Sequence, residues 1–482
     1  MKEGYSYDDI LIKPKYSEIE SRGDINLETN LTKNIKMKLP LISANMDTIT
    51  EDKMAIAMAI AGGIGIIHRF CSIEDQVKMV KNVKRYVNYR INRPYKISNY
   101  EKVENLVNMM RKNKVNSILV TGVNDNKLIG IVTKRDLNFI ENYDDLIVND
   151  IMTTIDNLIT GNENTTYEEA INVMRKHKVE KLPLIDSNQN IIGLFTAKDI
   201  LYYQNDMKLS NLDESYRLRC GAAIGINQDY YERADKLIDS DVDVIVIDIA
   251  HGHTLQCKNA IKEIKDLIWR KDKKVDIIAG NVCTAEGTKF LIEAGADAIK
   301  VNIGAGSICT TRIVSGCGVP QFTAVLDCAN EAKKYGIPII SDGGHCGSIG
   351  NIFKGLAAGA SSAMLGNFLS GTDETPGKLL VKDGRKVKMV RGMAGYFSNL
   401  SKFDKLGDNK DISSLCPEGV EGYVPYKGDV NSIIYQIKKG VSSGMSYVGC
   451  KNIDKLHKEE IEYVKISQTG KKESGSHSIN LI

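Results

Sequence analysis

The sequence predicts a (β/α)8 TIM barrel that is interrupted after its second strand by a smaller inserted domain. Three observations lead to this fold class. The chain has 482 residues, whereas a complete barrel needs only ~250. Short apolar strands alternate with helical stretches on both sides of a central segment. The central segment itself contains a repeated sequence.

Eight short apolar segments, each ending in small or polar residues, are the expected barrel strands. They are PLISANM (40–46), GIGIIH (63–68), CGAAIG (220–225), VIVIDIA (244–250), DIIAGNV (276–282), AIKVNIG (298–304), PIISDGG (338–344) and SSAMLGN (361–367). Helical patterns lie between them, for example at 285–296 and 325–336. Near-continuous apolar strands that alternate with helices are typical of parallel strands covered on both faces.

The inserted segment is a tandem repeat. MRKNKVNSILV begins at Met110 and MRKHKVEKLPL begins at Met174, while IGIVTKRDL (129–137) corresponds to IGLFTAKDI (192–200). Each copy has ~60 residues, too few to bury a good core alone, so we expect the two copies to pack together. The pattern resembles a tandem pair of CBS modules over residues 92–205. Residues 1–91 and 206–482 then form the barrel, with a flap near 393–418.

The resemblance to CBS modules implies a cleft for adenine or guanine nucleotides. Thr133, Asp136, Thr196 and Asp199 lie at the positions that contact a ribose in that family. Aspartate also caps helices routinely, so Asp136 and Asp199 could instead cap the helices that follow them. The sequence leaves both interpretations open.

Composition narrows the classes of function. Apolar residues make up 42% and charged residues 26%, and the net charge is only +3, so nothing favours a nucleic-acid or membrane partner. The longest apolar run, 54–67, is too short to span a bilayer. No targeting signal is visible, and the ten cysteines show no disulfide or zinc spacing. We therefore expect a cytoplasmic protein with reduced thiols.

In a barrel of this class the chemistry lies at the carboxyl ends of the strands. The expected ends carry mostly polar residues and glycines, with one methionine: Ser43, Asn45, Met46, Asp248, His251, Asn281, Gly304, Asp342, Gly343, Gly344, Gly366 and Asn367. A single Asp or Asn there could be a turn residue. So many together predict a site.

The strongest motif is GAGSICTTR, from Gly304 to Arg312, after the sixth strand. Its glycines free the backbone to meet a ligand, and Ser307 can donate to a phosphate. Cys309 could act as a nucleophile as its thiolate, and Thr311 could relay a proton.

Two further glycine-rich turns, Ser341–Gly344 and Met364–Asn367, follow the seventh and eighth strands. Loops at these places form the usual phosphate site of such barrels. Backbone N–H groups of Gly344, Gly366 and Asn367 could bind the anion, and Asp342 could accept from ribose hydroxyls.

These residues give the chain a resemblance to the family of IMP dehydrogenases and GMP reductases. The segments SANMDTIT, DIAHGHT, AGNV, GAGSICTTR, GVPQ, SDGG, RGM and PEGVEGYVPYKG all fit the family in order. The likeness covers almost the whole chain, including the CBS insertion.

The resemblance implies that Cys309 attacks C2 of the purine of a bound nucleoside monophosphate, and that C2 exchanges hydride with a nicotinamide cofactor. It assigns the nucleotide to Ser43, Met46, Ser307, Asp342, Gly344, Gly366, Asn367, Gly392, Met393 and Glu418. It assigns the cofactor to Asp248, His251, Asn281 and Gly304. Carbonyls of Gly304, Gly306 and Cys309 would bind a monovalent cation, K⁺, together with Glu473, Ser474 and Gly475 of a neighbouring subunit.

Two reactions are open to this family. The dehydrogenase oxidises IMP with NAD and then hydrolyses the adduct, using an Arg-Tyr pair on the flap as base. The reductase releases ammonia from GMP and accepts hydride from NADPH, with a Thr and a Glu delivering the proton. The chain between Met393 and Glu418 contains no arginine, and its only tyrosine is Tyr396.

We therefore expect a GMP reductase in which Thr311 and Glu418 help ammonia to leave. Val390 before RGM and Asn367 after the eighth strand also depart from the dehydrogenase pattern. Glu418 could alternatively do no more than bind the purine. An IMP dehydrogenase with a lysine base (Lys402, Lys405 or Lys410) is the second hypothesis, and a non-catalytic CBS nucleotide sensor is a remote third. The family resemblance further implies a homotetramer, or an octamer through CBS contacts.

Overall fold

The structure is a computed structural model that describes residues 1–86, 90–91, 94–113, 115–123, 125–138, 140, 142–143, 145–198, 200, 209–227, 229–395 and 416–475. The chain divides into two compact units. The first combines Met1–Tyr86 with Leu209–Ile482, and the second is Val87–Lys208. The sequence placed the inserted domain at 92–205, inside the second unit.

The first unit is the predicted barrel. Its eight strands are β4 (Leu41–Ser43), β5 (Ile64–Ile67), β13 (Gly221–Ile224), β14 (Val244–Asp248), β15 (Asp276–Val282), β16 (Ala298–Val301), β17 (Ile339–Asp342) and β18 (Ser362–Leu365). They form a closed barrel in chain order, with every neighbouring pair parallel. Each lies within one of the eight predicted segments, so the (β/α)8 prediction is confirmed.

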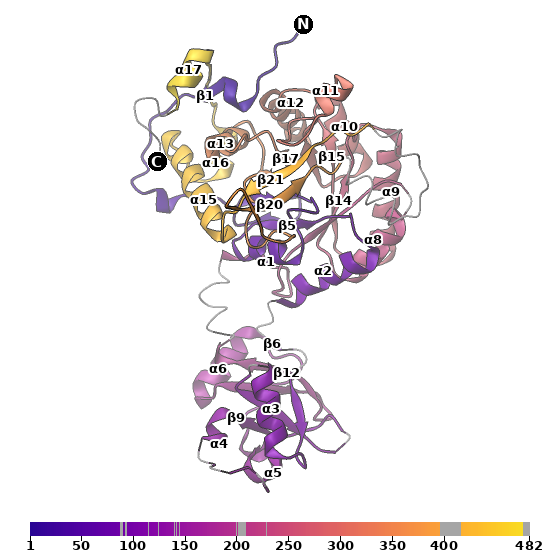
Figure 1. Cartoon of the computed structure of the whole chain (residues 1–482), viewed down its shortest axis with the longest axis vertical. Coiled ribbons are helices and arrows are strands. Elements are labelled where there is room, and N and C mark those ends of the chain that lie inside the picture. The colour runs from indigo at the N-terminus through magenta and orange to yellow at the C-terminus, as the bar shows by residue number, and fades with distance from the viewer. Residues whose placement is uncertain are drawn as a thin grey trace. The chain divides into compact units, whose positions relative to one another are not determined.

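Helices surround the strands, as Figure 1 shows for α8, α9 and α10. The helices that follow the strands are α1 (Asp52–Ile60), α2 (Ile73–Tyr86), α8 (Tyr230–Asp239), α9 (Leu255–Arg270), α10 (Ala285–Ala294), α12 (Gln321–Lys333), α13 (Ile349–Ala357) and α15 (Val430–Tyr447). A short α11 (Thr311–Ser315) precedes α12. The inserted unit follows α2, so it lies in the chain between the helix after the second strand and the third strand.

The interior of the barrel is filled by alternate strand residues, as the two-residue period of a strand requires. Ile64 and Ile66 of β5 and Val244 and Val246 of β14 belong to one fully buried cluster. Met37 of a short hairpin, β2 (Thr29–Asn30) and β3 (Lys36–Met37), joins the same cluster.

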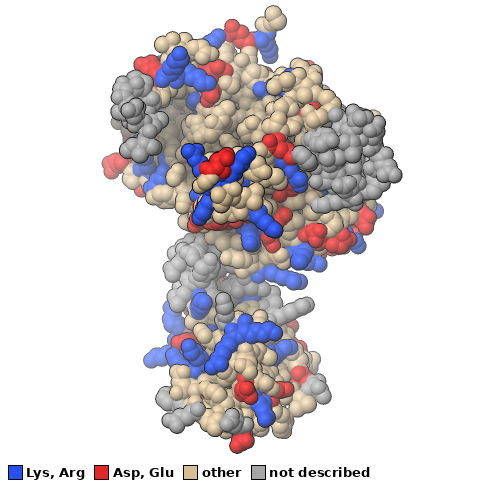
Figure 2. Space-filling view, viewed as in Figure 1, with Lys and Arg blue, Asp and Glu red and all other residues tan. Residues whose placement is uncertain are grey.

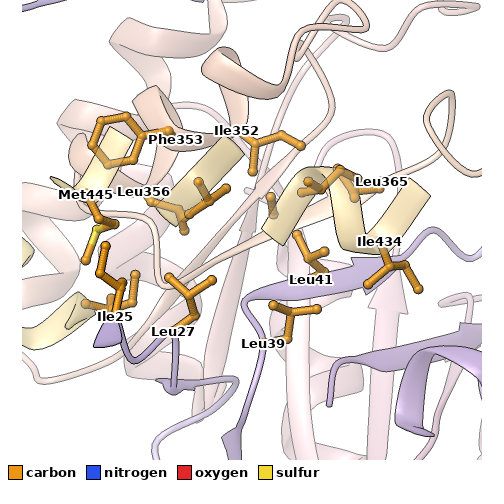
Figure 3. Packing of buried hydrophobic residues seen from close by; sticks show 14 of the residues in the cluster. Ile25, Leu27, Leu39, Leu41, Ile352, Phe353, Leu356, Leu365, Ile434 and Met445 are labelled. Carbon is orange, nitrogen blue, oxygen red and sulfur yellow. The ribbon is translucent and has the colours of Figure 1, made fainter. Parts of the chain in front are cut away.

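A second cluster packs the barrel wall against α13 and α15. Leu41 of β4 and Leu365 of β18 contribute to it from the barrel, and Figure 3 shows them beside Leu356 of α13 and Ile434 of α15. Burying such side chains contributes about 1.5–3 kcal/mol each. This apolar layer packs α13 and α15 against β4 and β18, the first and last strands of the barrel.

The two ends of the described chain meet on the barrel. β1 (Ile10–Ile12) pairs antiparallel with β22 (Tyr463–Lys465), in the register Ile10↔Lys465. A turn of 3-10 helix, η1 (Tyr7–Asp9), precedes β1. Two short helices, α16 (Ile453–Lys458) and α17 (Gln468–Glu473), flank β22.

A three-stranded antiparallel sheet follows the eighth barrel strand. It consists of β19 (Leu380–Lys382), β20 (Arg385–Arg391) and β21 (Glu421–Pro425), with β20 in the centre. β20 enters the segment that the sequence assigned to the flap, and β21 leaves it. Residues 396–415 between them lie outside the described residues.

The second unit contains the two predicted repeats. The first has β7 (Lys96–Ser98), α3 (Val103–Asn113), β8 (Ser117–Thr121), β9 (Leu128–Thr133), α4 (Lys134–Leu137), α5 (Val148–Ile151) and β10 (Thr153–Thr154). The second has α6 (Tyr167–His177), β11 (Lys181–Ile185) and β12 (Ile191–Thr196), with β6 (Arg90–Ile91) added at its edge. Leu119, Leu128 and Ile131 pack against Ile191 and Leu194, so the repeats share a core as expected.

On the face of the barrel unit shown in Figure 2, acidic and basic side chains are interspersed. In the described part of the chain, no helix combines the length and the apolar character that a membrane crossing requires.

Candidate active site at the carboxyl ends of the barrel strands

Cys309, Thr311 and Glu418 form one hydrogen-bonded chain. The Cys309 thiol donates to Thr311 Oγ1 at 3.2 Å, and the Thr311 hydroxyl donates to Glu418 Oε2 at 2.7 Å. All three side chains are partly exposed. A thiol proton can therefore pass through the hydroxyl to the carboxylate, which is what a nucleophilic sulfur requires of its neighbours.

Backbone contacts fix this arrangement from both sides. Thr310 N donates to Glu418 O at 2.9 Å, and Val420 N donates to Ile308 O at 3.0 Å. Gly392 packs against the same two segments, since an added Cβ would lie 3.3 Å from both Gly419 Cα and Ile308 O. The predicted site residues Gly392 and Glu418 thus border the Cys309 loop, with Met393 half-buried beside them.

Arg312 joins the two ends of the segment that contains Cys309. Its guanidinium donates to the carbonyl of Ile303 at 3.0 Å and to that of Val319. Gly304 has φ +75°, and a Cβ there would lie 2.5 Å from Arg312 Cγ. Glycine is therefore required at 304 both for its backbone conformation and for the close approach of Arg312.

Lys300 is a buried cation at the centre of the barrel mouth, and the sequence analysis missed it. Its ammonium lies 2.7 Å from Asp248 Oδ1 and 2.8 Å from Asp342 Oδ2. Burial alone would lower the pKa of Lys300, but the two carboxylates outweigh it and raise that pKa above its ordinary value. A lysine within the apolar segment AIKVNIG was the signal that could have revealed it.

The Lys300 cluster joins the predicted nucleotide and cofactor residues. Asn281 Nδ2 donates to Asp342 Oδ2 at 3.1 Å, and Asn45 Nδ2 donates to Asp248 Oδ2 at 2.8 Å. Burial works to raise the pKa of Asp248, but Lys300, Arg69 and Asn45 lower it overall. Both aspartates therefore present carboxylate oxygens at the mouth, where ribose hydroxyls could donate to them.

Arg69 is a second cation that the sequence analysis missed. It follows β5 directly and lies over the end of β13, where a Cβ at Gly225 would lie 3.3 Å from Arg69 Nη1. Among the described residues its buried Nε has no hydrogen-bond partner. Burial lowers the pKa of Arg69 despite the nearby charge of Asp248. The guanidinium lies over the Phe70 ring at 4.9 Å, and this Nε donor fits an anionic ligand group.

The predicted base-binding residues lie around the first and last barrel strands. Ser43, fully buried at the end of β4, accepts a hydrogen bond from Thr50 Oγ1 at 2.9 Å. Gly366 lies against Met46, whose sulfur would be 3.3 Å from an added Cβ. Arg391, the residue before Gly392, forms an ion pair with Asp47. These contacts bring the strand ends of β4 and β18 to the segment that carries Gly392.

The remaining predicted contacts are more open to solvent. Ser307, His251 and Asn367 are exposed, and Gly344 is half-buried. The His251 ring lies 6.3 Å from that of His253. Exposure at a barrel mouth leaves these groups accessible to a ligand.

The predicted cation ligands come from two places in the chain. Gly306 O accepts from Cys309 N at 3.1 Å within the loop. Glu473 ends α17, and Ser474 and Gly475 follow it. The sequence assigned these three residues to a neighbouring subunit, so the cation site stays a prediction. In the described ranges, no group of three His, Cys, Asp or Glu side chains could hold a metal ion.

In the inserted unit, Asp136 lies within α4 at its third position and closes a capping box with Thr133, the N-cap of that helix. Asp136 Oδ2 accepts from Thr133 N at 2.7 Å and from Thr133 Oγ1 at 2.9 Å. Thr196 is buried at the end of β12, and Asp199 lies outside the described residues. The capping interpretation of Asp136 thus has direct support, while nucleotide contact stays a prediction.

Comparison with known proteins identifies the family of the chain. Residues 4–477 match the model of the IMP dehydrogenase / GMP reductase domain. The chain is 46% identical to inosine-5′-monophosphate dehydrogenase of Aquifex aeolicus, covering 100% of this chain and 96% of that protein. It is 44% identical to GMP reductase of Leishmania major, covering 100% and 98%.

A solved structure is similar over the whole length. A Cys-to-Ala variant of Trypanosoma brucei GMP reductase, in complex with guanosine 5′-monophosphate, superposes with a TM-score of 0.90 at 41% identity, covering 100% of this chain and 99% of that one. The family prediction is confirmed: the chain belongs to the IMP dehydrogenase / GMP reductase family.

Proposed function

We propose that the protein is a GMP reductase, which converts GMP to IMP and ammonia with NADPH through a covalent adduct on Cys309. The observation that carries the proposal is the chain from the Cys309 thiol through Thr311 to Glu418. It supplies both a nucleophile and a path for the proton that ammonia release needs.

In the proposed reaction, the Cys309 sulfur bonds to C2 of GMP and the electron pair of the C2=N3 double bond moves onto N3, while the Cys309 proton moves to Thr311 and the Thr311 proton moves to Glu418. That pair re-forms the double bond when ammonia leaves, returns to N3 when hydride adds to C2, and re-forms the bond when sulfur leaves. Glu418 then returns a proton to the amino group on C2. The C2–N bond breaks, its electron pair leaves with nitrogen, and ammonia departs. A bound nicotinamide dinucleotide supplies the hydride that reduces C2. The C2–S bond then breaks with its electron pair on sulfur, and IMP leaves.

Asp248, His251, Asn281 and Gly304 are the proposed cofactor residues, and we add Arg69. The Nε donor of Arg69, which has no hydrogen-bond partner among the described residues, fits a dinucleotide because every such cofactor carries phosphate groups. The Lys300 ammonium lies between Asp248 and Asp342 and fixes the positions of both side chains.

The second hypothesis is IMP dehydrogenase, which oxidises IMP with NAD. Identities of 46% to a dehydrogenase and 44% to a reductase do not separate the two reactions. Hydrolysis of the adduct needs a base, and the sequence between Met393 and Glu418 contains no arginine. Lys402, Lys405 and Lys410 lie outside the described residues, and exposed lysines are mostly protonated near neutral pH.

The test follows the absorbance of reduced nicotinamide with two substrate pairs. We expect the purified protein to consume NADPH with GMP and to release ammonia, with little NADH formed from IMP and NAD. Cys309→Ala is the control and abolishes turnover while GMP binding persists. Steady NADH formation from IMP would contradict the reductase assignment. Full biological effect of Cys309→Ala would instead favour a non-catalytic sensor.

We also propose that carbonyls of Gly304, Gly306 and Cys309 bind K⁺, completed by Glu473–Gly475 of a neighbouring subunit in a homotetramer. Backbone carbonyls are suitable ligands for this ion. Replacing K⁺ by a bulky organic cation should lower turnover severalfold and leave GMP binding intact.

For the inserted unit we propose a purine nucleotide as regulator, at Thr133, Asp136, Thr196 and Asp199. A structure of Trypanosoma brucei GMP reductase with guanosine 5′-triphosphate, 36% identical over 97% of this chain with a TM-score of 0.78, supports the proposal. Calorimetric titration of the full chain with ATP and GTP tests it, with Thr196→Ala expected to weaken binding.

A further inference from the structure

The loop after β17 has an unusual backbone. Gly343, Gly344 and Gly347 have φ of +75°, +76° and +74°, and Cys346 has φ +50°. Glycine in such positions loses more conformational freedom on folding than other residues do, and a non-glycine residue is strained there. A loop of this kind binds a ligand well only if other groups hold its conformation.

Tyr7 holds the start of this loop. Its side chain is fully buried, and its hydroxyl lies 2.7 Å from Ser341 Oγ, the residue before Asp342. Gly355 makes room for the ring, since a Cβ there would lie 2.9 Å from the Tyr7 hydroxyl. Lys354 Nζ donates to the carbonyl of Tyr7 at 2.9 Å.

Tyr7 also holds the far side of the loop, through His345. The two rings are stacked at 5.7 Å with 7° between their planes, and His345 Nε2 lies 3.3 Å from Ser341 Oγ. Tyr7, Ser341 and His345 therefore form one closed triangle of contacts around Asp342, Gly343 and Gly344. Burial lowers the pKa of His345 to about 4, so the imidazole in this triangle is neutral near neutral pH.

The position of Tyr7 is itself set by both ends of the described chain. Asp9 accepts from Ser6 N at 2.7 Å and so closes the turn that contains Tyr7. Asp8 accepts from Asn351 at 2.8 Å and pairs with Lys471 of α17 at 3.0 Å. These contacts fix the backbone of the turn that contains Tyr7, so the Tyr7 side chain can restrict the conformation of the β17 loop.

We propose that Tyr7 is a positioning residue for the nucleotide: through Ser341 and His345 it holds Asp342, Gly343 and Gly344 in the conformation that binds the ribose and phosphate of the monophosphate. This role rests on the proposed nucleotide site at this loop, and holds for either reaction there. Tyr7 touches neither the substrate nor the reacting atoms.

The test uses Tyr7→Phe, which keeps the ring and removes the hydroxyl. Tyr463→Phe is the matched control, because the Tyr463 hydroxyl donates to Ala357 O at 2.8 Å and both rings make edge contacts with Phe322. Calorimetry on the full chain measures binding of GMP and IMP without turnover. Steady-state kinetics with GMP and NADPH separates KM from kcat, and thermal unfolding reports stability.

We expect Tyr7→Phe to weaken GMP and IMP binding by about fivefold to fiftyfold, because the buried Ser341 hydroxyl keeps only the longer of its two contacts, the one to His345. The KM for GMP should rise with kcat unchanged, and Tyr463→Phe should bind GMP as the wild type does. Ser341→Ala should weaken binding similarly, and the double variant should be no weaker than the worse single variant, because the residues act as one unit.

Binding within twofold of the wild type in Tyr7→Phe would overturn the proposal, as would an equal loss in Tyr463→Phe or additive losses in the double variant. If the wild type bound GMP and IMP but turned over neither, only the assigned reaction would fail. If it bound neither nucleotide, the site and this role would fail together.

Discussion

The Thr311 hydroxyl donates a 2.7 Å hydrogen bond to the Glu418 carboxylate, and so joins the loop after the sixth barrel strand to the segment before β21. Because Thr311 also accepts from the Cys309 thiol, it can move a proton in either direction. This pair is the most direct structural support for the chemistry that we propose.

Replacing Glu418 by Gln should lower kcat for GMP reduction by about 10²–10⁴-fold, since the amide cannot take up and return the proton. Thr311→Val should have a comparable effect, and the double variant should lose little more than either alone. Ser315→Ala is the control, because that hydroxyl donates only to Thr311 O among the described contacts. A kcat unchanged in Glu418→Gln would limit Glu418 to binding the purine.

Removing the buried cation in Lys300→Met should weaken both nucleotide and cofactor binding, because Asp248 and Asp342 lose the same partner. Breaking a buried ion pair typically costs about 3–5 kcal/mol of stability. Titrations of GMP and NADPH, with chemical unfolding, measure both effects. Lys289→Met, whose exposed side chain pairs with Glu293, should change neither. Loss of affinity for only one ligand would show that the two aspartates act separately.

Arg69→Met should raise the KM for NADPH by about 10- to 100-fold through loss of a charge-assisted contact to phosphate, with the KM for GMP unchanged. Arg69→Lys should recover part of the loss, since lysine keeps the charge without the planar fork. Arg270→Met, on the exposed face of α9, serves as control. An unchanged KM for NADPH would leave Arg69 as a structural cation beside Asp248.

Acid should destabilise the fold through His345. Its folded pKa is about 4, against 6.5 for the exposed group. Between these pH values the unfolded chain binds more protons, so this contribution is complete above pH 6.5 and decreases as pH falls towards 4, by about 3 kcal/mol. Denaturant unfolding from pH 7 to pH 4 should therefore be less pH-dependent in His345→Gln than in the wild type or in the exposed control His177→Gln.

α15 packs so closely against α13 that one added methyl group at their contact should lower the stability of the barrel unit. A Cβ at Gly444 would lie 2.3 Å from the Phe353 ring, so Gly444→Ala should destabilise the barrel unit by about 1–3 kcal/mol. Gly422→Ala adds a methyl group where no atom lies within 4 Å and should be nearly neutral. Equal midpoints of thermal unfolding for the two variants would contradict this.

The barrel could be predicted because its strands are buried on both faces and so read as continuous apolar runs, a local signal. The nucleophile loop and the turns after β17 and β18 were found by the same rule, at strand ends. Arg69 obeys this rule too, since it follows β5, but the end of the second strand was left out of the expected site. A wider application of the rule would have included it.

For other parts of the site, the partners have no local signal. Lys300 stands out as a lysine within an apolar strand, but its partners come from β14 and β17, so only the register of the four strands β14 to β17 shows that it meets them. Tyr7 lies 334 positions from Ser341. β19 and the two strands of the β2–β3 hairpin are too short for a periodic pattern.

The pairing of β1 with β22 also affects biosynthesis. β1, which follows the turn that carries Tyr7, is synthesised about 450 residues before its partner strand at 463–465. A nascent chain can therefore close most of the barrel while the β17 loop still lacks part of its support. Contacts of such long sequence separation form slowly, so we expect acquisition of nucleotide affinity to lag behind collapse of the barrel and to await synthesis of β22.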